Sequence, residues 1–312
     1  MNAEATRESY GKALAEIGSN KEVVVVDGDL SSSTKTALFA KKFPDRFIDV
    51  GVMEQSLFGI AAGLAYSGKT VFASTFAAFT TRAVDQIRFI AHDNLNVKIV
   101  ATHGGLTNGP DGWTHHSIED LAIMRALPNM AVVVPADAVE TKKVIAEASL
   151  VQGPWYVRLS RIPTPVVLDE GYVFKLGRGA VLEDGLDVTI IAAGNTVAMA
   201  LDAAKALKEK GIEAAVINMS SLKPIDESMI LKYAKATGAI VTAEEHNIHG
   251  GLGAAVAEVV SNSYPLPIEM VGINDRWGPS GDTSELWRLF SLTPESIVKA
   301  AEKAIAKKGT RT

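Results

Sequence analysis

The sequence contains no cysteine among its 312 residues. Without a thiol, the chain has no disulfide, no zinc–thiolate or iron–sulfur centre and no cysteine nucleophile. A lack of disulfides is typical of proteins from reducing compartments, so we expect a cytoplasmic location.

Long apolar runs and an excess of positive charge are lacking as well. The longest uncharged apolar stretch, residues 57–66, is shorter than the roughly 20 residues needed to span a bilayer. The formal net charge is -5, whereas binding to nucleic acid or to anionic membranes needs a basic surface. We therefore expect neither a membrane nor a nucleic-acid partner.

The composition is that of an ordinary globular protein, with 47% hydrophobic and 21% charged residues. At roughly 100–200 residues per domain, the length predicts two domains. The first 18 residues carry acidic and apolar residues in a pattern that predicts an amphipathic helix.

Short Val- and Ile-rich runs alternate with helical patterns along the first half. The expected strands are 22–29, 70–75, 97–103, 130–137 and 155–160, and the expected helices are 55–67, 78–91, 117–126 and 138–150. Apolar strands separated by helices favour a parallel sheet that is covered on both faces.

Residues 161–172 interrupt this alternation with prolines, a charge pair and a glycine, which predicts an interdomain connection. The pattern then resumes, with expected strands at 187–194, 213–221, 238–246 and 267–275 and a last helix at 294–307. The predicted fold class is α/β, with two domains, each a mostly parallel sheet flanked by helices. We place the boundaries at 1–168 and 169–312.

In open α/β sheets, ligands bind outside the carboxyl ends of the strands. Glu54 lies in such a place, where an apolar run gives way to a helical pattern. From its residue type alone, the simplest interpretation is an acid in the first turn of a helix, where the macrodipole favours negative charge. Phe76 and Phe79, at helical spacing, are most simply core residues.

The segment "THGGLTNGPDGWTHH", residues 102–116, follows another expected strand. Its glycines and proline impose an unusual path, and three histidines and an aspartate lie along it. The spacing does not favour a metal site, and the motifs G-x-S-x-G, GxxxxGK[ST] and a strand-linked GxGxxG are missing.

Taken together, these segments resemble a known family. "GVMEQ", "STFAAFTTRAVDQIR", the 102–116 loop and "VVVPAD" resemble the pyrimidine-binding domain of transketolase-type thiamine diphosphate enzymes. "TAEEHNIHGGLGAAVAEV" and "GINDRWGPSG" resemble the transketolase C-terminal domain. The resemblance covers nearly the whole chain.

The resemblance implies a binding site for thiamine diphosphate. Glu54 matches the catalytic glutamate that hydrogen-bonds to N1′ of the aminopyrimidine and so promotes loss of the C2 proton. Phe79 matches the ring that stacks on the aminopyrimidine, and Phe76 lies in the same wall. Asp29 matches an acid on the cofactor side, and Arg82 follows the pattern of deoxyxylulose-phosphate synthases.

The resemblance also implies substrate contacts. His115 matches a catalytic residue at the reacting centre, and Asp111 matches a group that meets the sugar hydroxyls. The residues that match a sugar-phosphate clamp are His103, Arg7, Ser33 and Arg161. His116 stands where the familiar motif has glutamine.

Complete transketolases also carry an N-terminal domain, in which GDG and a later asparagine hold the metal and the diphosphate. Here "DGDL" at 27–30 is not that motif, and we expect no such domain before residue 1. The chain thus resembles the C-terminal subunit of a split transketolase, active only with an N-terminal partner that supplies the Mg²⁺ ligands. A two-plus-two heterotetramer is implied.

The implied reaction transfers a two-carbon ketol unit from a ketose phosphate to an aldose, as in pentose phosphate metabolism. Three alternatives remain open on the residues: half of a deoxyxylulose-phosphate synthase, a 2-oxo acid dehydrogenase beta subunit, or a non-catalytic subunit that keeps the fold. The phosphate-clamp residues favour a phosphorylated sugar, and no metal ligand is expected on this chain.

Overall fold

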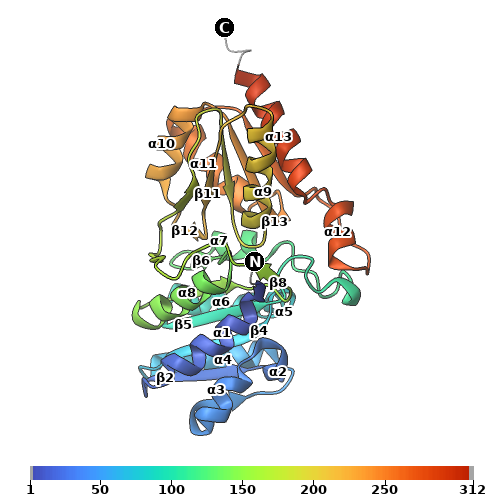
Figure 1. Ribbon diagram of the computed structural model, residues 1–312. Coiled ribbons are helices and arrows are strands. Elements are labelled where there is room, and N and C mark those ends of the chain that lie inside the picture. The colour runs from blue at the N-terminus through green and yellow to red at the C-terminus, as the bar shows by residue number, and fades with distance from the viewer. Residues whose placement is uncertain (1–2, 309–312) are drawn as a thin grey trace.

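The computed structural model describes residues 3–308 and shows two α/β domains, stacked one above the other (Figure 1). The first domain is built on a seven-stranded sheet with the order β12-β6-β7-β5-β4-β2-β3. Its own strands are β2 (Val23–Asp27), β3 (Phe47–Asp49), β4 (Thr70–Phe76), β5 (Val97–Thr102), β6 (Ala131–Val133) and β7 (Trp155–Arg158). These strands are parallel to one another, as expected.

Helices cover both faces of this sheet because successive strand residues point to opposite sides. On one face, Val25 and Val157 pack with α1 (Thr6–Ile17), α3 (Ala37–Lys42) and α8 (Ala138–Leu150). On the other face, Val26 and Tyr156 pack with α4 (Glu54–Tyr66), α6 (Val84–His92) and α7 (Asp120–Ala126). Shorter segments are α2 (Ser31–Thr34), α5 (Ala77–Thr80), η1 (Pro44–Arg46), η2 (Thr81–Ala83) and η3 (Gly109–Asp111).

The second domain has a five-stranded sheet with the order β14-β13-β10-β11-β9. The strands are β9 (Ala180–Glu183), β10 (Val188–Ala192), β11 (Ala214–Asn218), β13 (Ile240–Asn247) and β14 (Ile268–Ile273), of which β9 alone is antiparallel. The helices are α9 (Thr196–Glu209), α10 (Glu227–Thr237), α11 (Leu252–Ser263), α12 (Thr283–Leu289) and α13 (Pro294–Lys308). The predicted α/β class and mostly parallel sheets are confirmed.

Several boundaries differ from the expectation. The helix expected at 78–91 is divided into α5, η2 and α6, and the hydroxyls of Thr80 and Thr81 donate to carbonyls three residues earlier. Such bonds compete with the regular helix. The first helix begins at Thr6, after the short strand β1 (Ala3–Ala5); residues 1–2 of the expected helix lie outside the described range.

The predicted interdomain connection is not wholly irregular. It contains β8 (Pro163–Pro165), which pairs with β1 in antiparallel register. A second link is β12 (Ser221–Lys223), which leaves the second domain and pairs with β6 in the first sheet. One buried apolar cluster also runs through both domains, from α4 and α6 to α10 and α11. Between residues 3 and 308, no helix is long and apolar enough to cross a membrane.

Asp137 joins the start of α8 to the interdomain connection. Its Oδ1 accepts the Glu140 N–H at 2.9 Å, which caps the helix. Its Oδ2 accepts the N–H groups of Val167 and Leu168, both at 2.8 Å. The side chain is fully buried, so water cannot replace these bonds.

We expect Asp137→Ala to lower the free energy of unfolding by about 3 kcal/mol, because buried backbone donors lose their acceptor. Urea denaturation measures this change. Lys142→Ala on the same helix is the control, since its ion pair with Glu16 is half exposed and worth at most about 1 kcal/mol. Equal effects of the two substitutions would contradict the proposed role of Asp137.

Candidate active site

Most of the predicted site residues lie where parallel strands of the first sheet end. Phe76 is the last residue of β4, and His103 follows β5 directly. Glu54 begins α4 a few residues after β3, and Arg161 follows β7. Because the carboxyl ends of parallel strands share one edge, residues far apart in sequence meet there.

Four of these side chains form an aromatic cluster. The rings of Phe76 and Phe79 are stacked with centroids 5.4 Å apart. Phe76 also stacks on His103 at 3.8 Å, while the edge of His115 meets Phe79 at 5.2 Å. The structure therefore brings together residues that the resemblance assigns to the cofactor and to the substrate.

Glu54 joins this cluster through Arg82. Arg82 Nη1 lies 2.9 Å from Glu54 Oε1, and its guanidinium lies over the Phe79 ring, 4.3 Å from the centroid. Glu54 is 9% exposed, whereas the Arg82 side chain is 54% exposed. A mostly buried carboxylate thus pairs with a half-exposed guanidinium group.

Arg7, Ser33 and His103, which the resemblance assigns to a phosphate clamp, lie next to one another. Arg7 Nη1 donates to the carbonyl oxygen of Ser33 at 2.9 Å and lies 3.4 Å from His103 Nε2. Burial, with the nearby charges of Arg7 and Arg161, lowers the pKa of His103 to about 3. At neutral pH the ring is therefore uncharged, so its Nε2 accepts from Arg7 and its Nδ1–H donates to Thr102, 2.8 Å away.

Arg161 is held by the 103–117 loop, the segment between β5 and α7. Its Nη1 donates to Asn108 Oδ1 at 2.9 Å and lies 3.9 Å from Asp111 Oδ2. Asn108 is 1% exposed, and its Nδ2 has no hydrogen-bond partner in the structure. Burial, with the positive charge of Arg161, lowers the pKa of Arg7.

Two predicted residues are less closely tied to this set. Asp29 is exposed with φ +64°, and its N–H donates to Asp49; within residues 3–308, no hydrogen bond, ion pair or ring contact joins its side chain to the other candidates. His116 is buried beneath Gly278, and its Nε2 lies 3.4 Å from the carbonyl oxygen of Gly109. Its contacts are those of a residue that supports the loop.

Three functional neighbours were missed by the sequence reasoning. Asn108 orients Arg161, and Asp27 accepts hydrogen bonds from Thr34 and Thr36 and so shapes the segment that carries Ser33. Arg158 lies buried at the end of β7. An arginine within the apolar run "WYVRLS" was a signal in the sequence, whereas Asn108 and Asp27 gave none beyond their place in the quoted loops.

Two protein-family models together match most of the chain. The transketolase pyrimidine-binding domain matches residues 2–166, and the transketolase C-terminal domain matches residues 177–297. The chain belongs to the transketolase family.

Curated relatives include chains of similar length. A putative transketolase C-terminal section of Methanocaldococcus jannaschii is 49% identical over 299 residues, covering 94% of each chain. One of the subunits of an apulose-4-phosphate transketolase from Phocaeicola vulgatus is 41% identical, covering 98% of this transketolase chain and 99% of its own. Human transketolase is 37% identical over 97% of this chain, which spans 49% of that protein.

Solved structures agree with this assignment. A split-gene transketolase described as an inactive beta4 tetramer matches with a TM-score of 0.91 and 50% identity, covering 98% of this chain and 100% of that one. Transketolase from Pichia stipitis in complex with a sedoheptulose phosphate matches with a TM-score of 0.84 and 28% identity, covering 98% of this chain and 46% of that one.

Thiamine diphosphate is the cofactor that the family implies, and the site fits its aminopyrimidine. The planar guanidinium of Arg82 already lies on Phe79 and hydrogen-bonds to Glu54. A planar, nitrogen-bearing group is thus accommodated between an aromatic face and a carboxylate, the two contacts that an aminopyrimidine needs. Within residues 3–308, no group of three or more His, Cys, Asp or Glu side chains is placed to hold a metal ion.

The His103 ring should show no protonation step between pH 5 and pH 8, because burial and two arginines oppose its charged form. NMR titration of the ring carbons measures this directly. The unfolded chain binds the proton below about pH 6.5, so this residue lowers the stability of the fold as the pH falls from there toward 3. A titration midpoint near 6.5 would contradict the expected environment.

Proposed function

We propose that this transketolase chain is the C-terminal subunit of a heteromeric enzyme that transfers a two-carbon ketol unit from a ketose phosphate to an aldose or aldose phosphate. The observation that carries the proposal is the contiguous set Glu54, Arg82, Phe79, His115 and His103 at one sheet edge. A non-catalytic scaffold has no need of a buried carboxylate beside stacked rings.

Thiamine diphosphate, when bound, would supply the electron sink for transfer of the two-carbon unit, and this chain would supply the groups that hold and orient its aminopyrimidine. Glu54 would share a proton with N1′ of the aminopyrimidine in a hydrogen bond that replaces the one from Arg82, and Phe79 with Phe76 would form the wall beside it. Asp29 lies on the cofactor side. The Mg²⁺ and diphosphate ligands belong to an N-terminal partner in this proposal, which draws on the relatives named as a C-terminal section and as a subunit.

On the substrate side, His115 acts at the reacting centre and Asp111 meets the sugar hydroxyls. Arg7 and Arg161 carry the positive charge of the phosphate clamp, because His103 is neutral at physiological pH. His103 and Ser33 complete the clamp as hydrogen-bonding groups. Guanidinium groups suit phosphate because their planar fork makes parallel charge-assisted bonds.

We further propose a two-plus-two assembly, a cytoplasmic location and a domain boundary between residues 168 and 169. Pentose phosphates are the first substrates to test. A panel of sugars is needed, because the names of relatives include an apulose-4-phosphate transketolase and a 6-deoxy-6-sulfo-D-fructose transketolase.

Ketol transfer should require the partner. The chain alone, given Mg²⁺ and thiamine diphosphate, is expected to be inactive, and addition of the N-terminal subunit from the same organism should restore turnover.

In the mixed enzyme, Glu54→Gln should slow exchange of the cofactor C2 proton by about 10²–10⁴-fold, because the near-isosteric amide cannot share the proton. Robust turnover by the chain alone, or wild-type exchange in the variant, would refute these roles.

Arg161→Ala should lower kcat/KM for phosphorylated sugars about ten- to hundredfold, the value of one charge-assisted hydrogen bond. Hydroxypyruvate has no phosphate, so its turnover should change little. Arg88→Ala is the matched control, since that side chain is 67% exposed and, among residues 3–308, its ion pair is with nearby Asp85. If Arg161→Ala reduces the turnover of both donors equally, Arg161 is structural and not a phosphate ligand.

A further inference from the structure

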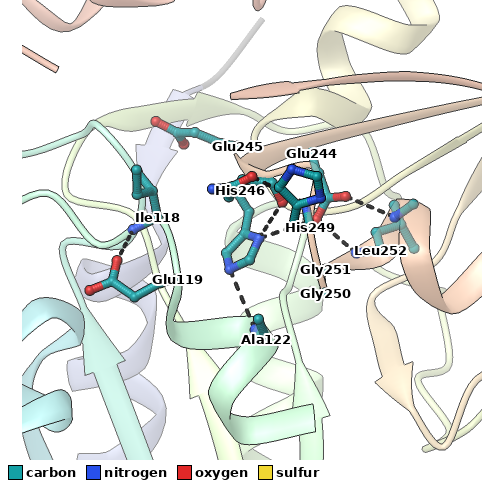
Figure 2. Close-up of polar contacts among 12 residues, drawn as sticks. Ile118, Glu119, Ala122, Glu244, Glu245, His246, His249, Gly250, Gly251 and Leu252 are labelled. Atoms are coloured by element: carbon teal, nitrogen blue, oxygen red, sulfur yellow. Dashed lines mark hydrogen bonds and ion pairs between the residues drawn. The ribbon is translucent and has the colours of Figure 1, made fainter. Parts of the chain in front are cut away.

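Three consecutive titratable residues near the carboxyl end of β13 have no part in the site described above. Glu244, Glu245 and His246 are all buried, at 3%, 5% and 0% exposure. Strand alternation sends Glu244 and His246 to one side and Glu245 to the other (Figure 2). Charged groups are rarely buried without specific partners, so the partners indicate the role.

Glu245 reaches from the second domain into the first. Its Oε1 accepts the Leu106 N–H at 2.9 Å and the Trp287 Nε1–H at 2.8 Å, and its Oε2 accepts from Asn195 Nδ2 at 2.9 Å. Leu106 belongs to the 103–117 loop, while Trp287 and Asn195 belong to the second domain. One carboxylate therefore links the loop to the second domain.

The loop is shaped to receive this carboxylate. Gly105 has φ +67°, and a Cβ built on it would lie 2.5 Å from Glu245 Cδ. Only glycine combines this backbone conformation with so close an approach. Two backbone hydrogen bonds between Gly105 and Ser117, at 2.9 and 3.0 Å, close the base of the loop.

Arg158 holds the second end of the loop, at Ser117. Its Nη2 donates to the carbonyl oxygens of Ser117 and Glu245, both at 2.9 Å. Its Nε lies 3.1 Å from Asp120 Oδ2, an ion pair that is 5% and 0% exposed. The two ends of the loop are therefore held by one buried network, to which the second domain contributes Glu245.

The tip of the loop also contacts the second domain. The Gly281 N–H donates to the Gly109 carbonyl oxygen at 3.2 Å, and the Trp113 and Trp277 rings meet edge to face at 6.2 Å. Figure 1 shows the loop running beside α12. The second domain thus touches the loop at its base and at its tip, on either side of Asp111.

We propose that Glu245 is a positioning residue, through which the second domain holds the 103–117 loop so that Asp111 and His115 stand in place for substrate. The proposal rests on the function proposed above for those two residues. A displacement of about 1 Å at a reacting group is enough to cost about 10²-fold in rate, so a rigid anchor far from the chemistry affects it.

Glu244 provides a matched control on the same strand. It is similarly buried and accepts two backbone N–H groups, from Leu252 at 2.7 Å and Gly253 at 2.8 Å, where Glu245 accepts one backbone and two side-chain donors. Both donors belong to the first turn of α11, so Glu244 acts within its own domain, as Figure 2 shows for Leu252. Loss of either glutamate removes a buried acceptor, but only Glu245 contacts the loop.

The test compares amide hydrogen exchange in the full-length chain for Glu245→Ala, Glu245→Gln and the corresponding Glu244 variants. We expect exchange at the Leu106 amide to rise about ten- to hundredfold in Glu245→Ala. The rise should be smaller in Glu245→Gln, since one amide oxygen still accepts from Leu106 but more weakly than a carboxylate. The Glu244 variants should instead speed exchange at Leu252 and Gly253.

Wild-type exchange at Leu106 in both Glu245 variants would overturn the proposal. So would an equal rise at Leu106 in the Glu244 variants, because that pattern means general destabilisation. If Glu245→Ala does not fold, the comparison of Glu245→Gln with Glu244→Gln decides the matter by the same criteria.

Activity provides a separate readout. In the enzyme reconstituted with its N-terminal subunit, Glu245→Gln should lower kcat for the sugar phosphate about tenfold with a smaller change in KM, whereas Glu244→Gln should leave kcat unchanged. An unchanged kcat in Glu245→Gln would contradict the positioning role. If the wild-type pair shows no ketol transfer, the proposed function is wrong, while the exchange experiment still decides whether Glu245 anchors the loop.

Discussion

The buried ion pair between Arg158 and Asp120 is the interaction on which the arrangement of the site depends. Both side chains are almost inaccessible to solvent, and Tyr156 donates a further hydrogen bond to Asp120 at 2.6 Å. Breaking a buried pair by removing one partner leaves an uncompensated charge, which makes such pairs costly to disturb. Here the pair fixes β7 against α7, and the loop between β5 and α7 is shaped around it.

The sheet and the elements around it contribute differently to the site. The first sheet gathers Glu54, Phe76 and His103 at one edge simply because its strands are parallel. The positions of loops at that edge are fixed by residues from outside the sheet, because Arg7 of α1 and Glu245 of the second domain hydrogen-bond to them. The second domain of this chain therefore helps to hold the loop in place.

The sequence predicted elements whose signal is local and missed those whose signal is not. The helix 138–150 is observed with the same bounds, because its apolar periodicity lies within the segment and Asp137, which caps it, directly precedes it. The strands β1, β8 and β12 are only three residues long and are stabilised by distant partners. The strand ends and the family resemblance gave the candidate site residues, which stay predictions, but Glu245 and Leu106 are 139 residues apart, and nothing in the sequence paired them.

Strand β12 follows β11 of the second domain in the chain but pairs with β6 in the first sheet, and this affects how the protein folds during its synthesis. Until residues 221–223 leave the ribosome, β6 has no neighbour on its outer side and is an exposed sheet edge. The first domain is therefore incomplete when its own last strand has been synthesised, and its folding extends into the synthesis of the second. A gene fragment cut between the two domains would leave that edge open to pairing with other chains.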